Sequence, residues 1–328
     1  MGKTMKASAL ALVTCIAASL AWAAPASAQD NYPSRNIRMI VSFPPGGGVD
    51  AVARLFADKM SAILGQPVVI ENRGGAAGLI AGRAVASAEP DGYTVLVATN
   101  SMVIAQLTNS AAGMSIERDL QAVASVAPQA NIVVATPGLP AATLKDVVEL
   151  SRKKPLNYSS PGTGSVPQLL LAHLITTLPG AQIAHVPFPG AAQALTATMA
   201  GQTELSVVTL PPAVTLVNSG KLKGLAVTTQ RRSGAVPDVP TATEAGYPSL
   251  SSTVWTGFFV PVKTPKPIAD KIGSAVLRVA AMPDIKDRLF QLGFEPISID
   301  GAQFQRDIAV EVKQWTDIIE KAGLKTQQ

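Results

Sequence analysis

The sequence contains very little of the chemistry that enzymes and metal centres use. Its 328 residues include one cysteine, Cys15, and two histidines, His173 and His185. Cys15 lies in an N-terminal leader, so the mature chain has no disulfide, thiol nucleophile, thiolate metal site or cysteine redox centre. His173 and His185 fall on a predicted helix and a predicted strand, where a packed histidine is a simpler interpretation than a general base. These absences argue against an enzyme and predict neither a metal nor a cofactor.

A strong excess of one charge is missing too. The leader holds two of the 27 basic residues, which leaves 25 basic against 22 acidic residues and a net charge of +3. The longest basic runs are Arg152-Lys153-Lys154 and Arg231-Arg232. Short runs of this kind are more often solvated loops than nucleic-acid interfaces. We therefore expect no nucleic-acid partner.

The first 28 residues have the pattern of a secretory signal peptide. Lys3 and Lys6 form a positive start, residues 7–24 are almost entirely apolar, and Ala26-Ser27-Ala28 supplies the small residues that a signal peptidase recognises. No apolar run of comparable length follows, so no membrane span is predicted for the mature chain. The pattern predicts cleavage after Ala28 and export to the periplasm.

Short β-branched runs alternate with longer amphipathic stretches along the mature chain, which is typical of α/β proteins. Strands are predicted at residues 37–43, 68–71, 93–98, 132–135, 157–159, 183–186, 205–209, 222–227 and 255–261. Helices are predicted at residues 49–64, 143–153, 268–281 and 302–321, and after the glycine-rich segments near residues 78 and 165. Thr143 is the expected N-cap of its helix. The alternation predicts largely parallel sheets.

The last predicted strand returns to the first unit, so the middle of the chain is interpreted as an insertion. We assign residues 29–130 and 256–328 to a first lobe and residues 131–255 to a second. The chain is predicted to cross between the lobes near residues 131–136 and 254–261.

A glycine-rich strand-to-helix junction occurs in both lobes. The first is 41–48 (VSFPPGGG), the second is 158–165 (YSSPGTGS), and 186–191 (VPFPGA) has the same form. Glycine lets a ligand approach the backbone, and a helix start presents free N–H groups and the positive end of the dipole. Junctions from both lobes therefore predict an anion site in a cleft between them. Ser165 and Gln168 also fit a capping box.

The loops that would form this cleft contain no lysine or arginine. They comprise residues 43–49, 99–104, 158–168 and 186–194. An anion held there would be bound by backbone N–H groups and hydroxyls rather than by a salt bridge. Phosphate is an alternative identity for that anion, but neither a Walker A nor a GxGxxG motif is present.

Several segments resemble one known family. They are YPSRNIRMIVSFPPGGGVDAVARLFADKM, PDGYTVLVATNS, LNYSSPGTGSVPQLLLAHL, HVPFPGAAQALTATMAGQ and GKLKGLAVTT. Together they look like the Bug-type receptors of tripartite tricarboxylate transporters, the TctC family, over essentially the whole mature chain. The resemblance implies a type II periplasmic binding-protein fold, an α/β fold whose two lobes, with mainly parallel sheets, are joined by two crossing strands. It nominates as ligand-binding residues Phe43, Pro45, Gly46, Gly47, Gly48, Thr99, Asn100, Ser101, Ser160, Gly162, Thr163, Gly164, Ser165, Phe188, Gly190, Ala191, Val208 and Thr209.

Two positions depart from the family pattern. Val208 stands where many relatives have an aspartate, and Met102-Val103-Ile104 follows a serine that relatives often continue with His or Thr. Without the aspartate, an ammonium-bearing ligand would lose a counter-charge. We therefore expect a less polar cleft that holds a carboxylate with an apolar or aromatic body, stacked near Phe43 or Phe188.

The resemblance implies a monomeric solute-binding protein rather than an enzyme. The expected ligand is a small mono- or dicarboxylate, including aromatic acids, and the expected partners are the integral membrane subunits of a tripartite transporter. A periplasmic sensor that presents its bound carboxylate to a signalling receptor is the alternative, and a secreted hydrolase or isomerase is a third hypothesis. Gly47→Asp or Gly164→Asp is expected to abolish binding without unfolding the protein.

Overall fold

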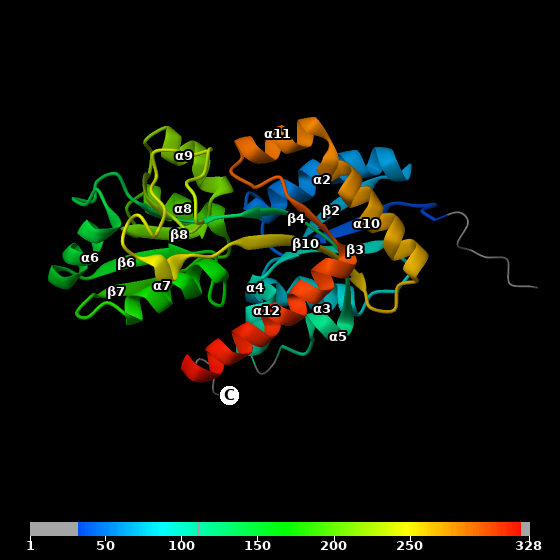
Figure 1. Ribbon diagram of the computed structural model, residues 1–328, viewed down its shortest axis with the longest axis horizontal. Helices are drawn as coiled ribbons and strands as arrows, with labels where there is room; N and C mark the ends of the chain where they lie inside the picture. The colour runs from blue at the N-terminus through cyan, green and yellow to red at the C-terminus, as the bar shows by residue number, and fades with distance from the viewer. Residues whose placement is uncertain (1–31, 110–111, 323–328) are drawn as a thin grey trace, which may run out of the picture. The chain divides into compact units, whose positions relative to one another are not determined.

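The computed structural model describes residues 32–109 and 112–322, with side chains described as far as Thr316. The predicted signal peptide, residues 1–28, lies outside the described residues. The chain from Arg35 onward forms one compact unit (Figure 1). This unit contains two β-sheets and the helices that pack on them.

The first sheet has six strands in the order β11-β4-β10-β3-β1-β2. Its strands are β1 (Ile37–Val41), β2 (Val68–Asn72), β3 (Thr94–Thr99), β4 (Leu120–Gln129), β10 (Val254–Pro261) and β11 (Ser298–Asp300). β1 pairs in parallel with β2 and β3, whereas β10 pairs antiparallel with β3 and β4, and β11 pairs antiparallel with β4.

The second sheet has five strands in the order β7-β6-β8-β5-β9. Its strands are β5 (Asn131–Ala135), β6 (Leu156–Ser160), β7 (Ile183–Pro187), β8 (Leu205–Thr209) and β9 (Lys223–Val227). β6 is parallel to β7 and β8, but β5 is antiparallel to β8 and β9. Both sheets are therefore mixed, and the prediction of mainly parallel sheets is wrong. The antiparallel pairs arise where the chain passes between the sheets through β4, β5 and β10.

Helices cover both sheets. They are α2 (Gly48–Leu64), α3 (Leu79–Ala86), α4 (Ser101–Thr108), α5 (Ile116–Asp119), α6 (Leu144–Lys153), α7 (Val166–Thr176), α8 (Ala191–Met199), α9 (Val214–Asn218), α10 (Lys266–Ala281), α11 (Pro283–Gln291) and α12 (Gly301–Ala322). Short 3₁₀ turns lie at Ala76–Gly78, Pro211–Ala213 and Pro248–Leu250. The predicted N-cap Thr143 is confirmed, since its hydroxyl accepts the Asp146 N–H in a capping box.

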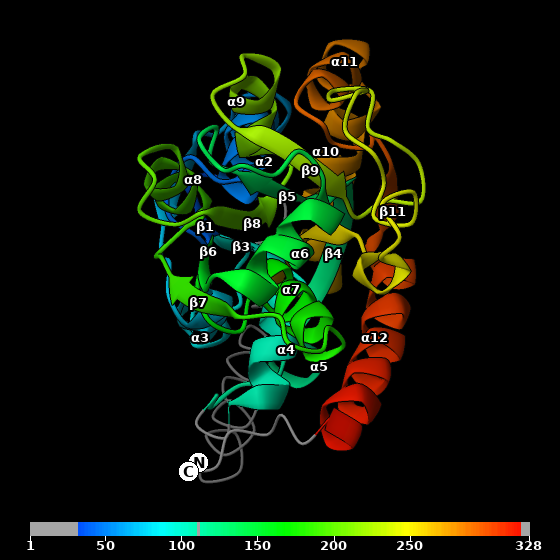
Figure 2. The same ribbon diagram turned by 90° about the vertical axis from the view of Figure 1, so that its left-hand side faces the viewer.

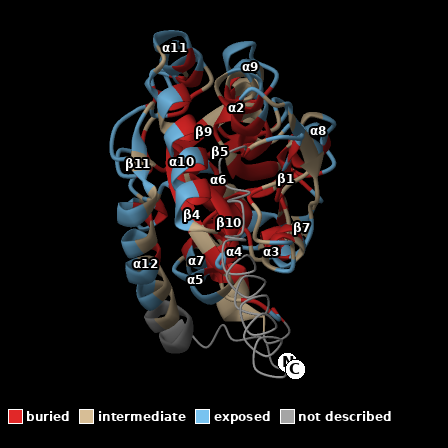
Figure 3. Cartoon of the chain, turned by 90° about the vertical axis from the view of Figure 1, so that its right-hand side faces the viewer, coloured by how far each residue is buried: buried red, intermediate tan, exposed pale blue. Residues whose placement is uncertain are grey.

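The apolar pattern of the strands explains where the helices pack. Every residue of β3 is buried, because helices cover the sheet on both faces. Leu96 and Ala98 belong to one apolar cluster with Leu79 and Val85 of α3, and Phe56 of α2 packs near Phe258 of β10. Figure 3 shows buried strands behind α10 and α12, whose outer faces are exposed.

The chain passes from the first sheet to the second through a single residue. β4 ends at Gln129 and β5 begins at Asn131, with Ala130 between them. The return runs through residues 228–253 into β10, and Figure 1 shows β4 and β10 extending toward the second sheet. A two-lobe α/β fold with two crossing segments is the result. The lobe boundaries at residues 130/131 and 255/256 stay a proposal, because the chain from Arg35 onward forms one compact unit.

Helix α12 contacts the apolar cores of both sheets. Trp315 packs against the cluster around Val133 and Tyr158 in the second sheet and against the cluster around Phe259 and Phe304 in the first. Figure 2 shows α12 running along one side of the molecule, and the helix packs against β4 and α4. The C-terminal helix therefore braces the two halves of the fold from one side.

Candidate functional site

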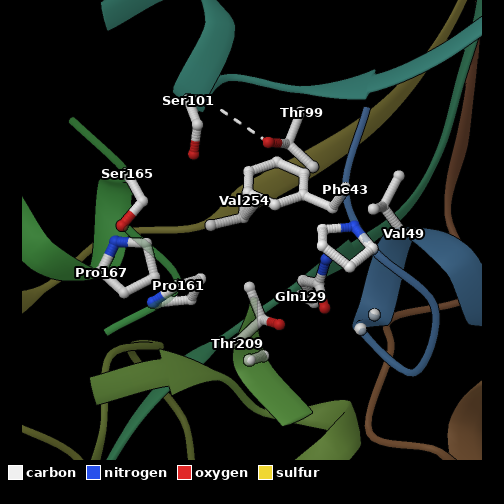
Figure 4. A pocket seen from close by; sticks show the side chains of 14 residues that line it. Phe43, Val49, Thr99, Ser101, Gln129, Pro161, Ser165, Pro167, Thr209 and Val254 are labelled. Atoms are coloured by element: carbon white, nitrogen blue, oxygen red, sulfur yellow. Dashed lines mark hydrogen bonds between the residues drawn. The ribbon is translucent and has the colours of Figure 1, made fainter. Parts of the chain in front are cut away.

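A cavity lies where the carboxyl ends of strands from both sheets meet. Its lining comprises Phe43, Pro44, Gly47, Gly48, Val49, Thr99, Ser101, Gln129, Pro161, Ser165, Pro167, Ala191, Thr209 and Val254. Figure 4 shows Ser101 and Ser165 on one side of the cavity and Gln129 and Thr209 on another. The residues come from both halves of the fold.

Four helices begin at this cavity. α2 starts at Gly48, α4 at Ser101, α7 at Val166 and α8 at Ala191, and each start contributes a residue to the lining or lies next to one. In none of these four helices does the side chain of the N-cap residue itself cap the helix, although Thr99 Oγ1 accepts the Ser101 N–H at the start of α4. Their first-turn N–H groups and the positive ends of their dipoles favour a negative charge in the cavity.

The four helix starts form two pairs, and each pair joins the two halves of the fold. A Cβ built on Gly46 would lie 3.3 Å from the Cβ of Ala192, and one built on Gly190 would lie 3.4 Å from Pro44 Cγ. The starts of α2 and α8 are therefore in contact. The second pair is α4 and α7, joined by a hydrogen bond of 3.1 Å from the Val166 N–H to Ser101 Oγ.

The buried carboxylate of Asp50 fixes the loop before α2. It accepts hydrogen bonds from the Gly46 N–H at 3.0 Å, Arg54 Nε at 2.9 Å and Asn72 Nδ2 at 2.9 Å. Asn72 Nδ2 also donates to the Phe43 carbonyl. Burial alone would raise the pKa of Asp50, but these hydrogen bonds outweigh it and the pKa is lowered. Asp50 thus stays charged and holds the Phe43–Gly48 loop in place without facing the cavity.

At the start of α7, more of the hydrogen-bonding groups already have protein partners than at the other three helix starts. Ser165 Oγ donates to the Gly162 carbonyl at 2.8 Å, and the Gly164 N–H donates to Gln168 Oε1. The predicted capping box of Ser165 and Gln168 is therefore wrong. Since the Val166 N–H is already bonded to Ser101 and Pro167 has no N–H, α7 offers few free donors. An anion finds more free N–H groups at α2 and α8.

Eight predicted residues line the cavity. They are Phe43, Gly47, Gly48, Thr99, Ser101, Ser165, Ala191 and Thr209. Four more lining residues, Pro44, Val49, Pro161 and Pro167, lie within the predicted cleft loops 43–49 and 158–168, and the remaining two, Gln129 and Val254, lie outside those loops. Val254 and Gln129 lie on the segments that join the two sheets. Gln129 was missed because β4 was not predicted, and the sequence carries no signal of its own for that side chain.

Ten predicted residues lie outside the lining. Pro45, Gly46 and Thr163 are exposed or half-buried, and Gly162 and Gly164 belong to the loop before α7. Gly190 is buried beside Pro44, and Phe188, Asn100, Ser160 and Val208 contact other parts of the protein. Gly164 has a φ of +80° and faces Ala77 rather than the cavity. Gly164→Asp would therefore strain the backbone, and it does not test the site.

Val208 and Phe188, both predicted to contact the ligand, lie outside the lining of the cavity. Val208 is fully buried in the core of the second sheet, because neighbouring strand residues face opposite ways and Thr209 takes the side toward the cavity. Phe188 packs on the outside of that core. Of the two predicted stacking residues, Phe43 alone lines the cavity.

Ser160 and Asn100 make hydrogen bonds within the protein rather than lining the cavity. Ser160 is fully buried, and its Oγ lies 2.7 Å from His185 Nε2. Burial lowers the pKa of His185, so the pair is a neutral internal contact beside the cavity wall. Asn100 Nδ2 donates to Glu311 of α12 and to the Thr253 carbonyl. This contact ties the start of α4 to the C-terminal helix and to the strand that joins the two sheets.

The cavity lining is uncharged. Its polar side chains are four hydroxyls and one amide, and none of the fourteen lining residues is Lys, Arg, His, Asp or Glu. Within the part of the chain that the structure describes, no group of three or more His, Cys, Asp or Glu could hold a metal ion. No helix of the described residues is long and apolar enough to cross a membrane. The lining therefore offers hydroxyls, one amide and backbone groups as hydrogen-bond partners, and no charged side chain.

Residues 52–324 match the sequence profile of the tripartite tricarboxylate transporter family receptor. The chain belongs to this family. The periplasmic binding protein BugD superposes with a TM-score of 0.86 at 31% identity, over 90% of this chain and 100% of BugD. The resemblance to Bug-type receptors and the two-lobe binding-protein fold are confirmed.

Two further structures of similar proteins come from R. palustris. One is a protein solved with adipate, with a TM-score of 0.84 and 30% identity over 89% of this chain and 98% of the other. The second is MatC with bound malate, with a TM-score of 0.80 and 32% identity over 88% of this chain and 100% of MatC. The receptor family and these neighbours are binding proteins rather than enzymes.

Proposed function

We propose that this receptor captures a small organic carboxylate in the cavity between its two lobes, in the periplasm. The observation that carries the proposal is the convergence of four helix starts on a cavity whose lining has no charged residue. Backbone donors at helix N-termini stabilise a carboxylate without a cationic side chain. That two neighbours contain adipate and malate supports the same ligand class.

The proposed ligand has an apolar body and a carboxylate end. Phe43, Val49 and Val254 with three prolines give the cavity a largely apolar wall, which suits aliphatic or aromatic carbon. The carboxylate is proposed at the starts of α2 and α8, because these keep more free N–H groups than α7. Delivery of the ligand to the membrane subunits of a tripartite transporter is the proposed role, in keeping with the receptor family.

Gly47→Asp tests the site. Gly47 lines the cavity, its φ is ordinary, and a Cβ there would meet nothing closer than 3.9 Å, so the variant should fold. Its carboxylate would occupy the ligand's anion position. Repulsion between like charges at short range is worth several kcal/mol, so affinity should fall by roughly 100-fold or more. A thermal-shift screen of mono-, di- and tricarboxylates, followed by titration calorimetry of the best ligand, measures it.

Gly138→Asp is the matched control. Gly138 is exposed, lies outside the cavity, and a Cβ there meets nothing within 4 Å, so the same charge is added without reaching the ligand. Wild-type affinity in this variant, together with lost binding in Gly47→Asp, supports the site. Equal affinity in both variants would refute it, and thermal shifts with sugars or cations alone would refute the ligand class.

A further inference from the structure

The cavity contains a buried amide without a hydrogen-bond partner. Gln129 is 1% exposed and lines the cavity. Neither Nε2 nor Oε1 has a partner among the described residues. If the amide is flipped, so that Nε2 and Oε1 exchange places, it still presents one unpaired donor and one unpaired acceptor. A buried polar group in this state is costly, so the amide calls for a partner that occupies the cavity.

The first turn of α2 lies against this amide. A Cβ built on Gly48 would lie 2.4 Å from Gln129 Oε1, so a side chain at position 48 would displace the amide. Gln129 stands at the end of β4, one residue before the chain passes to the second sheet. The amide therefore lies beside the first turn of α2, where the ligand carboxylate is proposed to bind.

The amide requires a chemical group that a bare carboxylate lacks. The other polar side chains of the lining are the hydroxyls of Thr99, Ser101, Ser165 and Thr209, each able to donate or accept. Gln129 Oε1 can only accept, so it requires a donor, and an ionised carboxylate has none. The amide Nε2 can donate to the carboxylate itself or to the oxygen of the donor group.

The donor on the ligand is expected to be neutral. An ammonium group in a buried cavity needs a nearby negative charge, and no lining residue is acidic. Asp50, which follows the lining residue Val49, is already engaged by Gly46, Arg54 and Asn72. A hydroxyl satisfies Gln129 without a counter-charge, since it both donates and accepts.

We infer that Gln129 is the specificity-determining residue of this cavity and selects a hydroxycarboxylate over the parent acid that lacks the hydroxyl. The inference rests on the proposed function, since it assumes that a carboxylate binds at the neighbouring helix starts. Without the hydroxyl, the Gln129 amide stays buried and unpaired. Sites built to hydrogen-bond a ligand hydroxyl discriminate strongly against the analogue that lacks it.

Matched pairs of acids test the inference on the full mature chain. The pairs are malate and succinate, 6-hydroxyhexanoate and hexanoate, and 4-hydroxybenzoate and benzoate, which differ within each pair by one hydroxyl. For the pair that fits the cavity, calorimetry should give the hydroxy acid roughly 10- to 100-fold tighter binding. In Gln129→Leu, which keeps the size of the side chain without its hydrogen bonds, this ratio should fall to about one.

Gln314→Leu is the control, because Gln314 is exposed on α12 and its variant should keep the wild-type ratio. The inference is overturned if the wild type binds the parent acids as tightly as the hydroxy acids, a result that needs no variant, or if Gln129→Leu folds and keeps the preference. If no acid of either kind binds, the proposed function itself fails. Binding of acids without hydroxyl preference refutes the role of Gln129 alone.

Discussion

Asp50 shows how one side chain prepares the cavity without touching the ligand. It engages the Gly46 N–H, and its partner Asn72 holds the Phe43 carbonyl. The first intrahelical bond of α2 runs from the Ala51 N–H to the Gly47 carbonyl, which leaves the N–H groups of residues 48–50 available to an anion. Asp50 lies in the first turn of α2, a position where an acidic residue is favoured for reasons local to the sequence. Its partner Asn72 lies at the end of β2, far from Asp50 in the sequence, so the way the loop is held could not be predicted.

The first prediction concerns the pH dependence that Asp50 creates. Because its pKa in the fold is lowered from 3.8, its contribution to stability is complete above that value and is lost as pH falls through the folded pKa. Asp50→Asn should cost about 2 kcal/mol at pH 7 through the lost charged hydrogen bonds. Urea denaturation from pH 7 down to pH 3 should show the gap from wild type narrowing on acidification.

The control for Asp50 is Asp58→Asn, on an exposed position of the same helix. It should leave stability within about 0.5 kcal/mol of wild type at every pH. A gap between Asp50→Asn and wild type that stays constant or widens on acidification would show that the carboxylate does not hold the loop in its charged form.

At the scale of elements, the strands of β-branched residues were predictable and β4 was not. The segment LQAVASVAPQ contains small and polar residues with weak strand preference. It becomes a strand because β10 and β11 pair with its two edges. Because β4 was not predicted, Gln129 at its end was not predicted as a cavity residue either. Many of the cavity residues came from glycine-rich junctions, whose function as helix starts is local and therefore predictable from sequence.

Helix α12 is attached to the rest of the fold by a half-buried acid that no sequence pattern revealed. Glu311 accepts hydrogen bonds from Trp255 Nε1 at 2.6 Å, Asn100 Nδ2 at 3.1 Å and Trp315 Nε1 at 3.3 Å. Trp255 lies on β10 and Asn100 at the start of α4. Burial raises the pKa of Glu311, and the three donors offset this only in part.

The second prediction follows from that raised pKa. A carboxyl with a raised pKa in the fold favours the folded state most at low pH, and stability declines as pH rises from 4.5 through the folded pKa. Glu311→Gln removes this decline. The free energy of unfolding of the variant, measured against wild type, should therefore shift in the variant's favour between pH 4 and pH 7.

Glu117→Gln, on an exposed position of α5, provides the comparison and should show no such shift. If the difference between Glu311→Gln and wild type does not change with pH, or changes in the opposite direction, Glu311 is not the titrating group that attaches α12.

At the scale of the whole molecule, contacts between the halves surround the cavity. α2 meets α8, and α4 meets α7. A Cβ built on Gly293, just after α11, would lie 3.0 Å from Leu210, which follows β8 of the second sheet. A Cβ built on Gly234, in the segment after β9, would lie 2.6 Å from Phe290 of α11. The two-lobe plan was predictable from the alternation of strands and helices. These contacts join residues far apart in the chain, so their pairing was not.

A ligand that bridges the paired helix starts should stabilise the whole unit by mass action. Ligand at 100 times its Kd raises the free energy of unfolding by about 2.7 kcal/mol when one site binds the folded state alone. The melting temperature should therefore rise with ligand concentration in the wild type and stay constant in Gly47→Asp. A rise of equal size in both proteins would place the ligand outside the cavity.

The most direct measurement is a crystal structure of the complex with the tightest-binding acid. We expect a carboxylate oxygen about 3 Å from first-turn N–H groups of α2 and α8, with no lysine or arginine in contact with it. A carboxylate bound away from these helix starts, or held by a cationic side chain, would contradict the proposal that backbone donors alone bind the anion of this receptor.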